Sequence, residues 1–248
     1  MFKGVKKTIK FRHHLKLVLS IDDWIQQHIY FTGTYEESEL LFIEKNLKPD
    51  STFIDIGANI GLFSITASAV VGDKGNIISF EPFSTNYDAF CHNININSIH
   101  NIKAERLAVA DKDKIIPLYY NQDESNLGMV SSYASNHTLK EEIISTSLDT
   151  YLSDKKINTV DIIKMDIEGG EYLALLGMKS TLIKYHPLLI IEIDNNILKD
   201  TPYSDKDIYT YLKELNYTPY YINSDGNLLA ERLAGDNSMN VVFRYNQN

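Results

Sequence analysis

Residues 53–65, FIDIGANIGLFSI, decide the fold of this chain. Apolar and β-branched residues lead into Asp55, glycines follow at Gly57 and Gly61, and the pattern then becomes amphipathic. The stretch therefore predicts a buried strand, a glycine-rich turn and the start of a helix. Loops of this kind bring backbone amides close to a nucleotide at the carboxyl end of a strand.

The strand–turn–helix pattern continues through the rest of the chain. The predicted strands are residues 51–56, 75–80, 102–109, 159–167, 186–194, 218–223 and 240–245, with helices between most of them. Strands that alternate with helices predict a parallel sheet covered on both faces, and the last two strands predict an antiparallel hairpin. We therefore predict an α/β, doubly wound, Rossmann-like sheet of about seven strands, the architecture of class I methyltransferases.

The predicted sheet occupies residues 49–248, with an insertion at about 111–147 that is rich in Ser and Asn. Residues 1–48 are predicted to form an N-terminal helical extension, a basic arm followed by two helices. The arm lacks the long apolar run and the small-residue cleavage site of a signal peptide. We interpret it as a solvated, partly helical segment, with weak peripheral membrane contact or an acidic substrate as the alternatives.

The composition narrows the class of protein. The chain has 248 residues and a formal net charge of -9, which argues against nucleic acid as a partner. Cys91 is the single cysteine, so no internal disulfide forms, and no apolar run is long enough to span a membrane. We expect a cytoplasmic protein and leave open whether it is a monomer or a homo-oligomer.

The loop predicts which nucleotide is bound. A dinucleotide fingerprint reads G-x-G-x-x-G, but here Asn59 stands where the second glycine is needed. Asp55 would repel a pyrophosphate and would suit a ligand that carries ammonium and sulfonium charge. Glu81 ends the next strand, where a carboxylate can bind ribose hydroxyls. These residues favour S-adenosylmethionine and disfavour a nicotinamide-dependent oxidoreductase.

With these motifs in order, the sequence resembles the FkbM family of S-adenosylmethionine-dependent methyltransferases. The matching segments are FIDIGANIGLFSI, SFEPFSTNYDAFCHNININ, SLDTYL, IIKMDIEGGEYLALLGM and PLLIIEID. The resemblance implies a class I fold and methyl transfer, typically to a hydroxyl oxygen of a sugar or secondary metabolite. It also implies the cofactor-binding residues: Asp55, Gly57, Asn59 and Gly61 at the methionine end, Glu81 at the ribose, Pro82, Asn86, Ala108 and Asp111 around the adenine, and Glu36 over the amino group.

The segment KMDIEGGEY, residues 164–172, is the best candidate for the chemistry. A sugar hydroxyl is a poor nucleophile at neutral pH, so the site needs a base, a metal or both. Asp166 and Glu168 are the candidate catalytic residues, while Glu171 fits helix capping equally well. We expect Lys164 to pair with Asp166 in a structural role.

Two alternatives to a lone carboxylate base stay open. Asp166, Glu192 and Asp194 could form an all-oxygen site for Mg²⁺. That arrangement is similar to the macrocin-type O-methyltransferases but lacks their adjacent pair of aspartates. His137, in the insertion that we expect to shape acceptor specificity, is another candidate base.

We therefore predict an O-methyltransferase that acts on a small-molecule or glycan acceptor. An N-methyltransferase that acts on an amine is one alternative, and a non-catalytic S-adenosylmethionine-binding protein is another.

Overall fold

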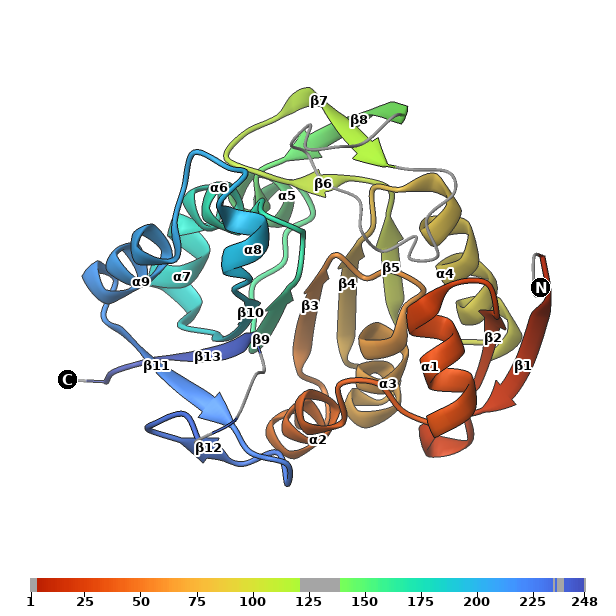
Figure 1. Cartoon of the computed structure of the whole chain (residues 1–248). Coiled ribbons are helices and arrows are strands. Elements are labelled where there is room, and N and C mark those ends of the chain that lie inside the picture. Colours follow the sequence, from red (N-terminus) through yellow and green to blue (C-terminus); the bar gives the residue numbers. More distant parts are fainter. Residues whose placement is uncertain (1–3, 121–138, 234, 236–238, 248) are drawn as a thin grey trace.

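A mixed sheet forms the centre of the molecule (Figure 1). The computed structural model describes residues 4–120, 139–233, 235 and 239–247. Across the sheet the strands are β12 (Leu228–Leu229), β11 (Tyr217–Ile222), β13 (Asn240–Tyr245), β10 (Leu188–Glu192), β9 (Ile162–Met165), β3 (Thr52–Ile56), β4 (Asn76–Phe80) and β5 (Ile102–Glu105).

The strands from β10 to β5 are parallel, and β13 lies antiparallel between β10 and β11. This arrangement confirms the predicted α/β sheet with a late antiparallel pair. The two-residue strand β12 was not predicted; it extends the edge beyond β11. Because β3 and β9 are neighbours, their carboxyl ends bring the loop after Ile56 next to the segment after Met165.

Helices cover both faces of the sheet. They are α1 (Trp24–Thr32), α2 (Glu37–Asn46), α3 (Leu62–Val71), α4 (Ser84–Ile96), α5 (Leu148–Asp154), α6 (Glu171–Leu176), α7 (Lys179–Tyr185), α8 (Asn195–Leu198) and α9 (Asp205–Glu214). Phe53 belongs to the apolar cluster under α1 to α4, whereas Ile54 and Ile56 belong to the cluster under α5, α6, α7 and α9. Alternate side chains of β3 therefore pack into the two apolar cores on opposite faces of the sheet, as a doubly wound fold requires. No helix among the described residues is long and apolar enough to cross a membrane.

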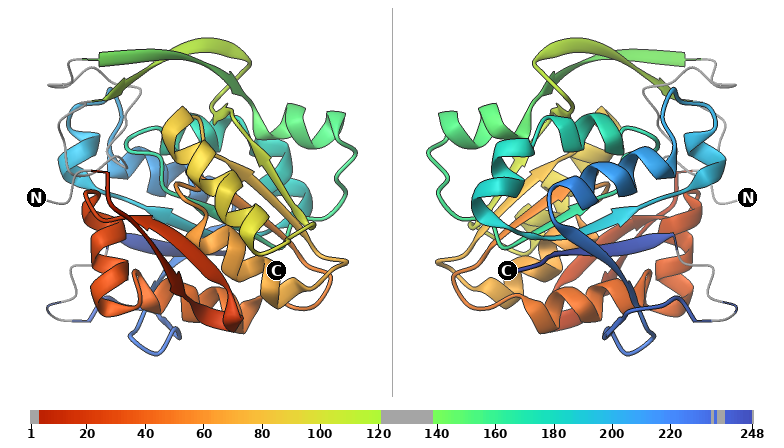
Figure 2. Two further views of the ribbon diagram at one scale, coloured as in Figure 1. Left: turned by 90° about the vertical axis from the view of Figure 1, so that its right-hand side faces the viewer. Right: turned by 90° about the vertical axis from the view of Figure 1, so that its left-hand side faces the viewer.

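The insertion forms a small three-stranded sheet of its own. Its strands are β6 (Ala108–Val109), β7 (Lys114–Tyr120) and β8 (Leu139–Thr146), in the order β6-β8-β7. The strand β6 begins three residues after β5 ends, so the small sheet rises from the carboxyl edge of the large one (Figure 2). Phe83, Leu118 and Ile143 form the apolar contact between them. Residues 121–138, with the candidate base His137, lie outside the described residues.

The prediction of a partly helical N-terminal arm is wrong. Strands β1 (Lys6–Lys10) and β2 (Lys16–Ser20) form an antiparallel hairpin, joined by a short 3₁₀ turn at Arg12–His14. Leu17 and Leu19 point into the core that includes α3 and α4, and Asn93 of α4 accepts a hydrogen bond from the backbone N–H of Val18 at 2.8 Å. These contacts to distant residues stabilise a strand that local sequence does not favour.

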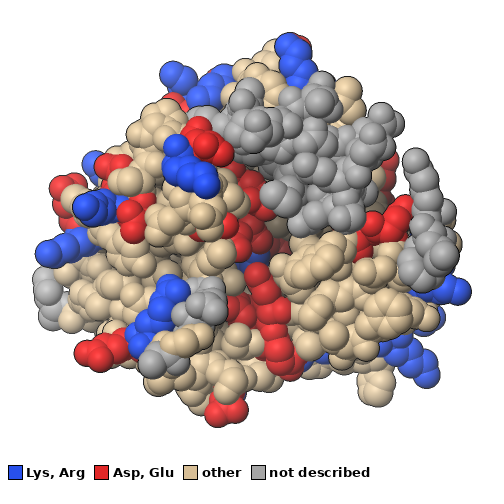
Figure 3. Space-filling model, viewed as in Figure 1, with Lys and Arg blue, Asp and Glu red and all other residues tan. Residues whose placement is uncertain are grey.

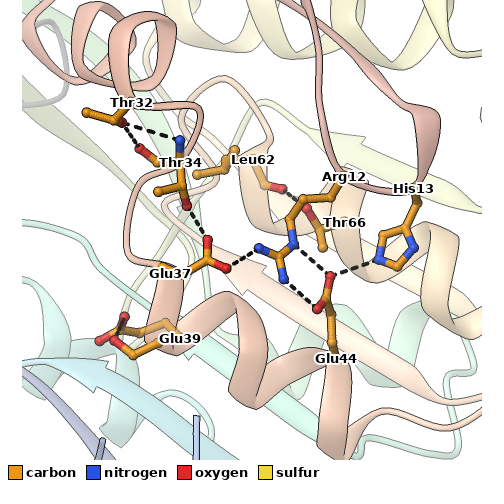
Figure 4. A network of polar contacts seen from close by, with 10 residues as sticks. Arg12, His13, Thr32, Thr34, Glu37, Glu39, Glu44, Leu62 and Thr66 are labelled. Atoms are coloured by element: carbon orange, nitrogen blue, oxygen red, sulfur yellow. Dashed lines mark hydrogen bonds and ion pairs between the residues drawn. The ribbon is translucent and has the colours of Figure 1, made fainter. Parts of the chain in front are cut away.

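The turn of the hairpin is tied to α2 by charged groups (Figure 4). Arg12 donates to Glu37 at 2.6 Å and to both oxygens of Glu44 at 2.7 and 2.8 Å, and a ring nitrogen of His13 lies 2.8 Å from Glu44. A bidentate guanidinium–carboxylate pair fixes orientation as well as distance. The turn at Arg12–His14 is therefore held against α2.

Candidate cofactor and catalytic site

The loop after β3 needs glycine at two positions. Gly57 has a φ of +86°, and a Cβ there would lie 1.8 Å from the carbonyl oxygen of Asp166. Gly61 has a φ of +90°, and its Cβ would meet the ring of Phe90 at 2.1 Å. The backbone therefore approaches β9 on one side and α4 on the other more closely than any side chain permits.

Glu81 closes the same loop from the neighbouring strand. Its carboxylate accepts hydrogen bonds from the backbone N–H groups of Asn59 at 2.7 Å and Phe83 at 3.0 Å, one on each oxygen. Burial raises the pKa of Glu81 to about 7, against the opposing effect of these two donors. A carboxylate has about four acceptor positions, so two remain for further donors. Asn86 of α4 is buried nearby in sequence, and Pro82 is half-buried.

Two carboxylate oxygens in this region lie buried without a hydrogen-bond partner. Asp55 accepts from Ser64 through Oδ2 at 2.5 Å, but Asp55 Oδ1 has no partner. Glu36, which precedes α2 with a φ of +48°, accepts from Asn240 through Oε1 at 3.3 Å, whereas its Oε2 has none. Buried polar atoms without partners are rare in folded proteins, so these two oxygens are acceptors that a bound group could use.

A buried lysine lies among the acidic side chains. Lys164 of β9 is 2% exposed, and its Nζ lies 3.3 Å from Oδ2 of Asp166 and 4.5 Å from the ring centre of Phe63. The predicted Lys164–Asp166 pair is confirmed. Burial alone would lower the pKa of the Lys164 ammonium, but nearby carboxylates outweigh that effect and raise it; they belong to Asp166, Glu36, Asp55 and Glu192.

Asp166 and Glu192 form a pair of hydrogen-bonded carboxyl groups. The charge of Asp166, followed by burial, raises the pKa of Glu192 to about 11. Burial would also raise the pKa of Asp166, but Lys164 and the hydrogen bond from Glu192 lower it. At neutral pH, the Glu192 carboxyl group is therefore protonated, and its O–H donates a hydrogen bond to the ionised carboxylate of Asp166.

The residues expected to bind Mg²⁺, Asp166, Glu192 and Asp194, do not form a metal site among the described residues. Asp194 caps α8 and accepts a hydrogen bond from the backbone N–H of Asn196 at 2.7 Å. Within the described ranges, no group of three or more His, Cys, Asp and Glu side chains is arranged to hold a metal ion. The acidic side chains at β3, β9 and β10 surround the Lys164 ammonium instead, so the Mg²⁺ expectation finds no support there.

The two glutamates that follow β9, Glu168 and Glu171, have different surroundings. Glu171, the first residue of α6, accepts from the backbone N–H groups of Ile167 at 3.1 Å and Gly169 at 3.3 Å, so it holds the turn before the helix; no side-chain hydrogen bond caps the start of α6. Glu168 has a φ of +52°, and burial, together with the charges of Asp166 and Glu171, raises its pKa to about 8. A half-buried carboxyl group with such a pKa, held in strained backbone, is typical of functional sites.

The remaining predicted residues lie at the base of the small sheet. Ala108 belongs to β6, and Asp111 accepts a hydrogen bond from Lys114 Nζ at 2.8 Å. The carbonyl oxygen of Ala110 lies so close to Gly177 that a Cβ there would approach it to 1.9 Å. Asp111 is therefore held by its own hairpin, in a segment packed against the start of α7.

A pocket of about 300 Å³ opens beyond β10. Asp194, Asn195, Asp205, Tyr209 and Arg232 contribute the polar part of its lining. Asp194, which lines the pocket, also contributes with its charge to the raised pKa of Glu168. Figure 3 shows acidic side chains gathered in the hollow at the middle of this face.

Comparisons with known proteins agree on a methyltransferase. A model of the "Methyltransferase FkbM domain" matches residues 55–219. The methyltransferase sdnD of Sordaria araneosa is 24% identical over 162 residues, which cover 54% of this chain and 62% of that protein.

Two solved structures show the fold. The methyltransferase FkbM from Methylobacillus flagellatus KT has a TM-score of 0.54 at 18% identity, and the match covers 89% of this chain and 52% of that chain. A SAM-dependent O-methyltransferase from Thermotoga maritima has a TM-score of 0.50 at 11% identity, and the match covers 98% of this chain and 78% of that chain. This chain thus spans less than two thirds of the length of sdnD and of the Methylobacillus protein.

Proposed function

This chain belongs to the FkbM methyltransferase family, and we propose that it transfers the methyl group of S-adenosylmethionine to a hydroxyl oxygen of a sugar, glycan or glycosylated metabolite. The oxygens of Asp55 and Glu36 that have no hydrogen-bond partner carry the proposal, because the ammonium of this cofactor would donate hydrogen bonds to such acceptors and its sulfonium would be attracted to their negative charge. A pyrophosphate would bring the opposite charge to the same place.

The proposed cofactor position follows from the loop and its neighbours. Asp55, with Gly57, Asn59 and Gly61, borders the methionine end, and Glu36 faces the ammonium from the start of α2. Glu81 receives the ribose hydroxyls on its two remaining acceptor positions. Pro82, Asn86, Ala108 and Asp111 would hold the adenine.

Methyl transfer needs a nucleophile that is held in line and loses its proton. We assign proton removal to Glu168, because a base with a pKa of about 8 is well matched to neutral or slightly alkaline conditions. Asp166 is a weaker base, since Lys164 and Glu192 hold it ionised, and it orients the acceptor hydroxyl instead. When bound, S-adenosylmethionine would supply the methyl group, with the electron pair of its carbon–sulfur bond left on sulfur, and Glu168 would take up the hydroxyl proton.

The pocket beyond β10 supports a sugar as acceptor. Carboxylate, amide and guanidinium groups from Asp205, Asn195 and Arg232 suit the paired hydroxyls of a sugar ring, and Tyr209 offers an aromatic surface. At about 300 Å³, its volume is at the small end of ligand pockets, so it would hold a single sugar unit.

Calorimetry with S-adenosylmethionine tests the cofactor assignment. Glu81→Gln removes the charge that would bind ribose but keeps the size of the side chain. We expect cofactor affinity to fall by roughly 10- to 100-fold, because hydrogen bonds to a charged group contribute about 1.5–3 kcal/mol each. Glu214→Gln, at an exposed position of α9, is the matched control. Unchanged affinity in Glu81→Gln would exclude the ribose assignment.

A labelled-methyl assay tests the acceptor class. Neutral monosaccharides, polysaccharides and amino sugars are supplied in parallel with labelled S-adenosylmethionine. We expect label on the neutral sugars and in an alkali-stable ether. Label confined to the amine of the amino sugars would replace the proposal by N-methylation.

A further inference from the structure

The first twenty residues differ in charge from the rest of the chain. They contain six Lys and Arg residues and no Asp or Glu, although the whole chain has a net charge of -9. A cluster of basic residues on an acidic protein creates a local positive potential that attracts anionic surfaces.

The hairpin gathers three of these cations on one face. Lys10 lies directly opposite Lys16, and Lys6 lies opposite Ser20, while the pair Ile9–Leu17 points the other way into the core. Residues opposite each other in an antiparallel pair share a face, so the three lysines project together away from the protein. All three are exposed, and no acidic side chain of the described residues forms an ion pair with them.

The pairing of Lys10 with Lys16 is unfavourable by itself. Like charges directly opposite in a sheet repel, and a hairpin that served only to cover the core could avoid them. Arg12 and His13, in the turn, are instead bonded to Glu37 and Glu44, so acids are used where the hairpin is anchored but not on its outer face (Figure 4).

The helix that contacts this hairpin, α1, carries exposed aromatic rings. Trp24 is 54% exposed and Phe31 is 68% exposed, and both lie on one stripe of α1, seven residues apart. The backbone N–H of Ser20 in β2 donates to the side chain of Gln26 in α1 at 2.8 Å, so the helix and the hairpin are joined. Figure 2 shows α1 and the hairpin side by side on the same flank of the molecule.

We propose that Lys6, Lys10, Lys16, Trp24 and Phe31 form a docking face for a membrane with anionic lipid headgroups. Lysines are attracted to the negative surface potential of such a membrane, and Trp is favoured at the boundary between headgroups and acyl chains. Stable attachment without a spanning helix takes more than one signal, and here charge and exposed aromatic area occur together. An acidic protein partner would also match the lysines, and binding to polyglutamate is therefore measured beside binding to vesicles.

Vesicle binding tests the proposal without cofactor or acceptor, so its outcome is independent of the proposed methyl transfer. The probes are vesicles of phosphatidylcholine alone and vesicles of equal parts phosphatidylglycerol and phosphatidylcholine. Because Trp24 is the single tryptophan of the chain, its emission reports directly on this face. We expect co-sedimentation and a blue shift of the Trp24 emission with the anionic vesicles, and neither with the neutral vesicles.

A triple variant, Lys6→Gln/Lys10→Gln/Lys16→Gln, should reduce partition into anionic vesicles roughly 100-fold, since each surface lysine contributes about fivefold. Phe31→Ser should weaken binding while leaving its dependence on salt unchanged. The matched control, Lys179→Gln/Lys206→Gln/Lys213→Gln, removes the same charge from exposed positions of α7 and α9 and should bind as the unmodified protein does.

Thermal unfolding confirms that each variant is folded. The proposal is overturned if the unmodified protein does not sediment with anionic vesicles, if it sediments equally with neutral ones, or if the two triple variants bind alike. Lysine-dependent binding to polyglutamate in the absence of vesicle binding would assign the face to an acidic protein and would also overturn it.

Discussion

Replacing Lys164 by Met should destabilise the protein strongly, and by an amount that depends on pH. Met keeps most of the apolar stem that packs on Phe63 but removes the ammonium, which lies 3.3 Å from Asp166. The variant therefore leaves the buried carboxylate of Asp55 and the half-buried carboxylate of Asp166 without their counter-charge.

The magnitude follows from the distance. At 3.3 Å and an effective dielectric constant of about 20, the two charges attract by roughly 5 kcal/mol. Breaking a buried pair by removing one partner costs about 3–5 kcal/mol, because the remaining charge stays desolvated. For a chain of this length that loss corresponds to a fall in Tm of about 6–20 °C.

The loss of stability in Lys164→Met should depend on pH, because the substitution changes the pKa of Asp166. In the unmodified protein the pKa of Asp166 is lowered, so this residue contributes stability that is present above its unfolded pKa and is lost as pH falls. In Lys164→Met that pKa rises above the unfolded value, so the variant gains stability as pH falls and Asp166 binds a proton. The difference between the two proteins should thus be large at pH 8 and small at pH 5.

Urea unfolding at pH 8 and pH 5 measures both quantities. Lys184→Met, at an exposed position of α7, is the control, and it should change the free energy of unfolding by less than about 0.5 kcal/mol. The double variant Lys164→Met/Asp166→Asn should recover part of the loss, because it removes both charges of the pair. A loss below about 1 kcal/mol at pH 8, or a difference that grows toward pH 5, would refute the reasoning.

Three further predictions concern the same site. If Glu168 removes the proton, kcat should rise about tenfold per pH unit below its pKa of about 8 and level off above it. A Glu168→Gln variant whose kcat still rose with pH in this way would show that another residue is the base. Prolonged dialysis against EDTA should leave activity unchanged, because Lys164 supplies the positive charge among the acids; a loss reversed by Mg²⁺ would contradict this. Gly57→Ala should cost at least about 3 kcal/mol in urea unfolding, since its Cβ would strike the Asp166 carbonyl, whereas Gly33→Ala, with a similar φ and open space, should cost only about 1–2 kcal/mol; equal losses would show that the clash is relieved.

The sequence predicted the parts of the fold that depend on local pattern. The strand, turn and helix around Gly57 and Gly61 are confirmed, because apolar periodicity and glycine spacing are short-range signals. The N-terminal hairpin was missed for the opposite reason. Its strands are short and rich in lysine, and they are held by Asn93 of α4 and by Asn97 just after that helix, more than seventy positions away.

The candidate site was predicted only as far as its acidic residues. Asp55, Glu81 and Asp166 stand at the ends of strands, which made them visible in the sequence. The central place of Lys164 could not be predicted from the sequence, since a lysine is almost never fully buried, whereas Lys164 is. The depth of a side chain, and which acids surround it, depends on strand order across the whole sheet.

The position of β13 has a consequence for how this protein is made. Both of its neighbours, β10 and β11, are translated before it, and the contact of Asn240 with Glu36 joins residues 204 positions apart. A nascent chain on the ribosome therefore carries an open hydrogen-bonding edge on β10 until residue 245 has emerged. Such edges recruit other strands, so we expect slow synthesis near the end of this domain to favour aggregation, and early termination there to yield a chain without a complete site.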